Sequence, residues 1–330
     1  MTFKSDNPCV RAHVNQRRPG RAMIAMILAV TLMPIAATAE GQGPQSFKDC
    51  AECPDMVIIP PGRFTMGAPE SESLDRKFGW GGPPIEVTIA KRFALAASEI
   101  TRAQFAAFVA ETGYVQDGRC RSIWEKRLAD PTRVSWRDPL WPNGEKQADD
   151  HPVVCIGFED AQAYVAWLNA KAGGRRRYTL PSEAQFEYAA RAGTDGRRPW
   201  RGPVEESCKY ANVGDTNYLK VISEYGAIAC DDGYAFTSPV KAFPANAFGL
   251  YDMVGNVWEW VQDCRAEDLT ATPRDGSALE GAPADCNRRV LRSSGYSSAD
   301  WYTRVTTRGG DPVPGTRLVV LGFRVAATVE

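Results

Sequence analysis

The sequence predicts an α+β domain with little regular secondary structure that is held together by disulfides. Apolar residues repeat at helical spacing in only three segments, and the strand-like runs are short. Eight cysteines follow the N-terminal region, an even number that suits a disulfide framework. The 29 glycines and 9 tryptophans also indicate a loop-rich chain, because glycine adopts backbone angles that other residues avoid.

The N-terminus has the pattern of an export signal. Basic residues at 17–21 precede an apolar run over 22–37, and Ala37 and Ala39 offer the small residues that a signal peptidase requires. A retained membrane anchor is the alternative, but the run is shorter than the roughly 20 residues of a spanning helix. We therefore expect residues 1–39 to be a signal peptide and the mature protein to be periplasmic or secreted. Residues 40–53 then form a linker with a Cys-x-x-Cys pair.

The domain proper is expected at 54–330 and opens with strands. Residues 56–59 and 63–66 read as two strands around a Pro-Pro-Gly turn, and 85–89 alternate like a half-buried strand. Residues 68–84 are rich in proline, glycine and charge, which predicts a loop.

Three helices follow, each with recognisable ends. Thr101 can cap the first helix, which stops at Gly113. The second helix is expected over 160–171 and the third from Ser182, with glycines after both. Residues 114–150 are predicted to be a long loop. After 194 we expect only short strands, at the following positions: 240–243, 257–261, 290–292, 302–306 and 323–327.

The cysteine spacing favours four sequential disulfides. These are Cys50–Cys53, Cys120–Cys155, Cys208–Cys230 and Cys264–Cys286. Three of them would close long loops, each worth about 3–4 kcal/mol in the chain-entropy picture. Metal binding by Cys50 and Cys53 is a weaker alternative, because zinc needs about four ligands and His151 is the one histidine after residue 39. A redox-active Cys50–Cys53 pair also remains open.

Five stretches in register resemble one protein family. They are MVIIPPGRFTMG at 56–67, EITRAQFAAF at 99–108, LPSEAQFEYAAR at 180–191, GLYDMVGNVWEW at 249–260 and GFR at 322–324. This pattern is similar to the formylglycine-generating-enzyme, or sulfatase-modifying factor, family. The resemblance implies that family's fold, an α+β domain related to the C-type lectins.

The resemblance also implies two structural calcium sites. Calcium prefers six to eight oxygen ligands, often carboxylates mixed with backbone carbonyls. The first site would use the side chains of Asn212 and Asp232 with the carbonyls of Val213 and Tyr234. The second would use the side chains of Asp252 and Glu259 with the carbonyls of Gly255 and Val257. Alternatively, Asp252 and Glu259 only hydrogen-bond the backbone of a tight turn.

At the expected catalytic centre the chain departs from the family. The resemblance implies two cysteines that bind copper(I) near the C-terminus, and thiolates are the soft ligands that this ion prefers. Ser298 and Asp300 fall at these positions, and no cysteine follows Cys286. We therefore expect neither copper nor the oxidation of a substrate cysteine to formylglycine.

The same stretch offers candidates for a ligand groove. Tyr296 and Trp301 could line it, and Asp300 with Arg304 and Arg308 could bind a carboxylate or a peptide backbone. A surface ion pair at a strand edge is the alternative interpretation of the charged residues.

Two functions remain after these observations. The first is an exported, calcium-stabilised module that binds a peptide or protein in the family's substrate groove. The second is an oxidoreductase of the formylglycine-generating type, or one that matures a periplasmic peptide, with a carboxylate such as Asp300 or Glu99 taking part. The net charge of −1 gives no field that would attract nucleic acid, and we expect no stable membrane span after signal cleavage.

Overall fold

The computed structural model describes residues 44–68, 82–122, 124, 128, 130–222, 226–281, 286–309 and 312–329. The expected signal peptide lies outside these residues. Contacts group residues 43–330 into one unit, to which everything below refers. Within the described residues, none of the helices combines the length and the apolar character that crossing a membrane requires.

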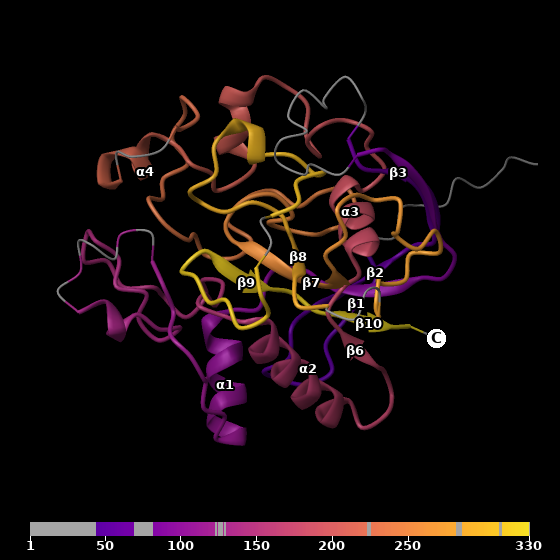
Figure 1. Ribbon diagram of the computed structural model, residues 1–330, viewed down its shortest axis with the longest axis horizontal. Coiled ribbons are helices and arrows are strands. Elements are labelled where there is room, and N and C mark those ends of the chain that lie inside the picture. Colours follow the sequence, from indigo (N-terminus) through magenta and orange to yellow (C-terminus); the bar gives the residue numbers. More distant parts are fainter. Residues whose placement is uncertain are drawn as a thin grey trace, which may run out of the picture. The chain divides into compact units, whose positions relative to one another are not determined.

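A five-stranded antiparallel sheet joins the start of the domain to its end. Its strand order is β1-β2-β5-β10-β6. The strands are β1 (Ser46–Phe47), β2 (Met56–Ile59), β5 (Phe93–Ala96), β10 (Ala326–Thr328) and β6 (Tyr178–Thr179). The C-terminal strand β10 lies between β5 and β6, so the sheet contains strands from both ends of the domain. Figure 1 shows β10 beside β6. Part of the expected 40–53 linker belongs to this sheet, as β1.

Two smaller sheets complete the strands. A hairpin pairs β3 (Gly62–Met66) with β4 (Ile85–Ile89). A three-stranded sheet has the order β8-β7-β9, and its members are β8 (Arg289–Arg292), β7 (Trp258–Cys264) and β9 (Leu321–Phe323). In this sheet β7 is antiparallel to β8 and parallel to β9.

The three predicted helices are present, and their caps explain their bounds. Helix α1 (Arg102–Thr112) starts with a capping box between Thr101 and Gln104, and α3 (Glu183–Arg191) starts with one between Ser182 and Gln185. Helix α2 (Phe158–Ala172) begins two residues before the predicted start, because the Asp160 carboxylate accepts a hydrogen bond from the Gly157 amide. Helices α1 and α2 pack side by side (Figure 1).

Several short elements differ from the prediction. Residues 302–306 form no strand, because the amides of Tyr302 and Thr303 donate locally to Ala299 and Asp300, which closes a 3-10 turn at Asp300–Tyr302. Residues 240–243 form a turn instead of a strand. Helix α4 (Thr216–Val221) and the 3-10 helices at Pro131–Arg133 and Val204–Lys209 were not predicted, since each is too short to show a clear apolar period.

The large sheet separates two hydrophobic clusters. Along β5, Ala94 and Ala96 pack into a cluster that includes residues of α1 and α2, whereas Phe93 and Leu95 pack into one that includes residues of α3. This alternation follows from the two-residue period of a strand. Helix α3 also contacts β3, β7 and β8, so it links the hairpin to the three-stranded sheet.

The eight cysteines form the four sequential disulfides. Cys50–Cys53 closes a tight turn next to β2, and the other three bridges span 35, 22 and 22 residues. Cys120–Cys155 and Cys208–Cys230 tie down irregular segments that the sequence predicted as loops. The disulfide-stapled character of the predicted fold is thus confirmed.

A buried ion pair connects the two larger sheets. Arg324 lies between β9 and β10, and its Nε and Nη2 atoms donate to the two carboxylate oxygens of Glu259 on β7 at 2.7 and 2.8 Å. Its remaining donors reach the carbonyls of Ala96, Tyr251 and Asp252. Both side chains of the pair are fully buried. Arg324 therefore joins β5, β7 and the loop after Leu250 at one point.

Replacing Arg324 should destabilise the protein strongly. Arg324→Met leaves the Glu259 carboxylate buried without its partner, which typically costs about 3–5 kcal/mol. The double variant R324M/E259Q should recover part of this loss, because the unpaired charge is removed. Urea unfolding measures the difference.

The control for this experiment is Lys146→Met, which breaks an exposed pair with Asp138. We expect it to change the free energy of unfolding by less than about 1 kcal/mol. If R324M cost no more than K146M, Arg324 would not be the joint between the sheets.

Candidate functional site

The positions expected to hold the catalytic cysteines lie in a tight loop. Ser298 is buried, and its hydroxyl accepts a hydrogen bond from the Gly295 amide at 2.9 Å. The Asp300 side chain is 44% exposed and forms an ion pair with Arg198. Ser298 therefore stabilises the turn, and the Asp300 charge is balanced by a residue that no sequence motif indicated.

Two aromatic residues, Trp301 and Tyr302, directly follow Asp300. Trp301 is 47% exposed and contacts the ring of Tyr302, with 6.0 Å between ring centroids. Tyr302 in turn packs edge-on against Trp258 at 5.9 Å. This aromatic row, defined as Trp258, Tyr302 and Trp301, runs from the end of the three-stranded sheet to the surface. An exposed tryptophan beside a carboxylate is a typical feature of a recognition surface.

Three of the expected groove residues are buried. Tyr296 is fully enclosed, and its hydroxyl donates to the Val319 carbonyl, so its ring belongs to the core. Arg308 donates through Nε and Nη2 to the two carboxylate oxygens of Glu183, at 2.6 and 3.0 Å. Arg304 is only 4% exposed. The expected carboxylate-binding group of Asp300, Arg304 and Arg308 is therefore not formed at the surface.

The arginine interactions explain this difference. Glu183 and Glu187 on α3 form a buried network with three guanidinium groups, those of Arg191, Arg292 and Arg308. Burial alone would raise the pKa of Glu183, but Arg308 and Arg292 hold it below its ordinary value. Two acidic residues four positions apart on a buried helix were the signal in the sequence that basic partners would be needed.

Hydrogen bonds link three of the four residues of the first expected calcium set, and the fourth, Asn212, is next to one of them in the chain. Asn212 is fully buried, and its amide donates to the Phe236 carbonyl at 2.7 Å and to Asn256. Its Oδ1 atom has no hydrogen-bond partner among the residues that the structure describes. Asp232 accepts hydrogen bonds from the amides of Val213 and Tyr234, at 2.8 and 2.9 Å. A buried, unpartnered oxygen beside a carboxylate fits a cation with oxygen ligands.

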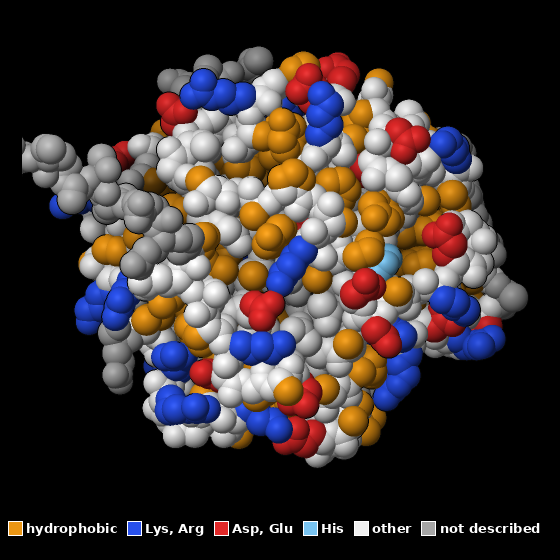
Figure 2. Space-filling view, turned by 180° about the vertical axis from the view of Figure 1, so that it is seen from behind, with side chains coloured by type: hydrophobic (Ala, Val, Ile, Leu, Met, Phe, Trp, Pro, Cys, Tyr) orange, Lys and Arg blue, Asp and Glu red, His pale blue; other side chains and the backbone are white. Residues whose placement is uncertain are grey.

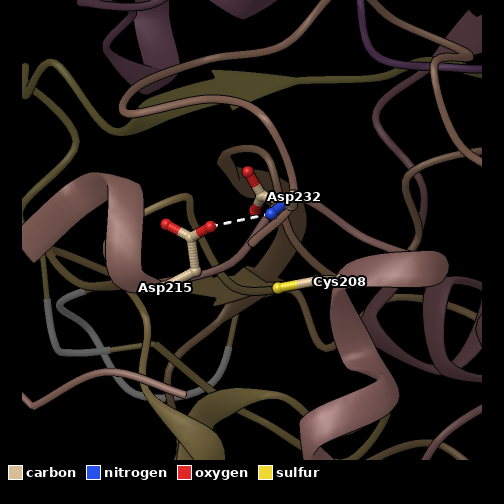
Figure 3. Close-up of side chains that lie close together, drawn as sticks. All are labelled: Cys208, Asp215 and Asp232. Carbon is tan, nitrogen blue, oxygen red and sulfur yellow. Dashed lines mark hydrogen bonds between the residues drawn. The ribbon is translucent and has the colours of Figure 1, made fainter. Parts of the chain in front are cut away.

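Asp215 supports the same site, although the sequence analysis did not include it. Its Oδ2 atom accepts from the Asp232 amide at 2.8 Å, and its Oδ1 atom caps α4 (Figure 3). Burial, together with the charge of Asp215, raises the pKa of Asp232 to about 7. Cys208 lies near both carboxylates, but its sulfur is bonded to Cys230 and so offers no thiolate. The ligands that these residues offer to a cation are thus oxygen atoms.

In the second expected calcium set, the Asp252 carboxylate is the residue best suited to bind a cation. The Asp252 carboxylate is buried, and its Oδ2 atom accepts from the Lys241 amide. Its Oδ1 atom has no partner within the described ranges. Both oxygens of Glu259 already accept from Arg324, so Glu259 could reach a cation only through its remaining lone pairs. The Gly255 carbonyl accepts from the Ser293 hydroxyl. Asp252 is therefore the best ligand of this set.

Glu99, the other carboxylate considered for catalysis, is not at the surface. It is 1% exposed and follows β5. Burial and the charges of Asp252 and Glu259 hold the pKa of Glu99 well above its ordinary value. Glu99 cannot contact a ligand in a surface groove.

The charged side chains show no concentration of one sign on the face seen in Figure 2. Lysine and arginine side chains alternate there with aspartate and glutamate side chains (Figure 2). This mixture agrees with the net charge of −1 of the full chain.

Comparisons with known proteins agree with the fold and identify relatives. Residues 43–329 match the family described as the sulfatase-modifying factor enzyme 1-like domain. The chain is 32% identical over 302 residues to a Bos taurus protein named inactive C-alpha-formylglycine-generating enzyme 2, covering 83% of this chain and 88% of the relative. It is 30% identical over 299 residues to a Thermomonospora curvata formylglycine-generating enzyme, covering 82% and 93%.

A solved structure supports the same assignment. The structure described as PvdO from Pseudomonas aeruginosa superposes with a TM-score of 0.71 at 34% identity, covering 88% of this chain and 100% of that one. The predicted α+β fold with few regular elements and several disulfides is therefore confirmed, whereas its relation to the C-type lectins stays a prediction. On sequence and structure together, this chain belongs to the sulfatase-modifying factor family.

Proposed function

We propose that this protein is an exported, calcium-stabilised member of the family that binds a peptide or protein and does not carry out copper–cysteine oxidation. One observation carries the proposal. The two positions that the resemblance assigns to the copper-binding cysteines hold Ser298 and Asp300, and both side chains have structural partners.

The donor set argues against copper(I) at these positions. A hydroxyl and a carboxylate are hard ligands, whereas copper(I) prefers thiolates. All eight cysteines after residue 43 are in disulfides, so none of them supplies a free thiolate. The Bos taurus relative, whose name calls it inactive, shows that loss of the oxidation is compatible with this family.

The aromatic row supports a binding role. Trp301 is among the few large apolar side chains that are exposed in the described ranges, and Tyr302 and Trp258 support it from behind. Tryptophan and tyrosine contribute large contact areas at low entropic cost, which makes them frequent anchors of peptide ligands. The Asp300–Arg198 pair beside them adds polar groups to the same surface.

Export and calcium are supported by the chemistry of the chain. Four disulfides suit an oxidising compartment such as the periplasm or the extracellular space. At the first site, Asn212 and Asp232 would hold calcium with the carbonyls of Val213 and Tyr234, where the ion would fix loops that lack regular structure. At the second site, Asp252 would be the main ligand, as described above.

The first prediction concerns oxidation. A Cys-x-Pro-x-Arg peptide incubated with the purified protein, copper, oxygen and a reductant should keep its cysteine, because no thiolate pair is available to bind the metal. Mass spectrometry of the peptide reads the outcome, and a formylglycine-generating enzyme run in parallel confirms the assay. Conversion of the cysteine to an aldehyde would overturn the binding-only function and favour the oxidoreductase.

The second prediction concerns the binding surface. If the same peptide, labelled with a fluorophore, binds to the aromatic row, Trp301→Ala should weaken binding about tenfold or more, as expected for a buried aromatic anchor. Val313→Ala is the matched control, because Val313 is also exposed but lies outside the row. Fluorescence anisotropy measures both affinities. Absence of binding, or equal losses in the two variants, would argue against this surface for peptides of this type.

The third prediction concerns pH without metal. The pKa of Asp232 is about 7 in the folded protein and near 3.8 in the unfolded chain. The folded state thus holds a proton that the unfolded state releases, and this stabilisation is complete below about pH 4 and is lost as the pH rises through about 7. Asp232→Asn should remove up to about 1.4 kcal/mol per pH unit from the slope of stability against pH.

Urea unfolding in a chelator at several pH values tests this, with the exposed Asp195→Asn as the control. Other buried carboxyls also contribute to the wild-type slope, so the difference between wild type and variant is the quantity of interest. Adding calcium should flatten the wild-type slope, because the cation competes with the proton. Identical slopes in wild type and D232N would contradict the assigned role of Asp232.

A further inference from the structure

Three buried carboxyl groups share a single guanidinium group behind the second calcium set. Glu99, Asp252 and Glu259 are 1%, 6% and 0% exposed, respectively. Arg324 pairs with Glu259, and the nearby ammonium of Lys241 is committed to Asp55 at the surface. With all three acids ionised, this buried cluster carries two uncompensated negative charges, an arrangement that a folded protein does not tolerate without a counter-ion or a proton.

The oxygens without a hydrogen-bond donor indicate where a proton or a cation would bind in this cluster. With both carboxyls ionised, Oε1 and Oε2 of Glu99 and Oδ1 of Asp252 meet no hydrogen-bond donor among the described residues. The two carboxyl groups lie within hydrogen-bonding reach of each other. Two ionised carboxylates offer only acceptors, so they repel unless a proton or a cation lies between them.

Charge and ligand chemistry favour a divalent cation over a proton. One shared proton would still leave a buried charge of −1 on the cluster, whereas a divalent cation would neutralise it. Carboxylate oxygens are the hard ligands that calcium prefers, and calcium accepts six to eight oxygens. Because both oxygens of Glu259 accept from Arg324, the carboxylate best placed to join Asp252 is Glu99.

We propose that Glu99 is a ligand of the second cation, held jointly with Asp252, while Arg324 neutralises Glu259. The proposal rests on the calcium part of the proposed function and adds to it a residue that neither the family resemblance nor the sequence motifs place at a metal site. Glu99 lies two residues before Thr101, the cap of α1, so the cation would tie the start of this helix to the loop that contains Asp252.

The test uses Glu99→Gln, which has the shape of a protonated glutamate but no charge. Calcium is titrated into the metal-free full-length mature protein and followed by isothermal titration calorimetry, with calcium-dependent melting as a second readout. We expect wild type to bind two calcium ions and E99Q to lose at least tenfold in affinity at one of them. The calcium-induced rise in melting temperature should shrink in E99Q, and melting without calcium should change little.

Glu86→Gln is the control, because it removes the same charge from an exposed position on β4 that is not part of the cluster. If E99Q does not fold, Asp252→Asn serves as a second variant. A further measurement needs no variant: elemental mass spectrometry gives the metal content of the untreated wild-type protein.

Each failure has its own signature. If calcium binds at two sites and E99Q titrates like wild type, Glu99 only shares a proton with Asp252, and this inference is overturned while the calcium-stabilised function stands. If the protein binds one calcium ion, lost in D232N and retained in E99Q, the second site is absent. If no calcium binds at all, both the inference and the calcium part of the proposed function are wrong.

Discussion

The fold depends on the buried pair between Arg324 and Glu259. In a chain with few long helices or strands, few backbone hydrogen bonds connect distant segments. Arg324 connects them through its side chain instead. Its guanidinium donates hydrogen bonds to Glu259 on β7 and to three carbonyls, among them that of Ala96 on β5. A buried charge pair of this kind is costly to form and more costly to break, so its partners must be positioned together.

Similar pairs join irregular segments to two of the helices. Glu183 on α3 binds Arg308 from the segment after the aromatic row, and Asp160 on α2 binds Arg317 through two hydrogen bonds. These contacts, with three long-range disulfides, replace the order that secondary structure supplies in other domains. They also explain why arginines that a sequence analysis would assign to a ligand groove are used within the core.

Around residue 300, most side chains are used to hold the structure together and one large aromatic side chain stays exposed. Ser298 stabilises a turn, Asp300 is paired, and Trp301 is the large side chain left exposed there. The chain has the fold of its family, and the serine and aspartate at positions 298 and 300 are hard ligands. A shared fold therefore does not by itself fix the chemistry of a site.

The sequence by itself determined the three longer helices, the main strands, the sequential disulfides and the family, because caps, apolar periods and cysteine spacing are local signals. It also showed that Ser298 and Asp300 cannot act as thiolates, since ligand chemistry is a property of the residue type. Only the tertiary structure decided which charges are buried and how they are paired. Glu99 and Asp252 are 153 residues apart in sequence, and neither has a local pattern that places it against the other. Burial and long-range pairing arise from packing between distant segments, and no window of the sequence contains that information.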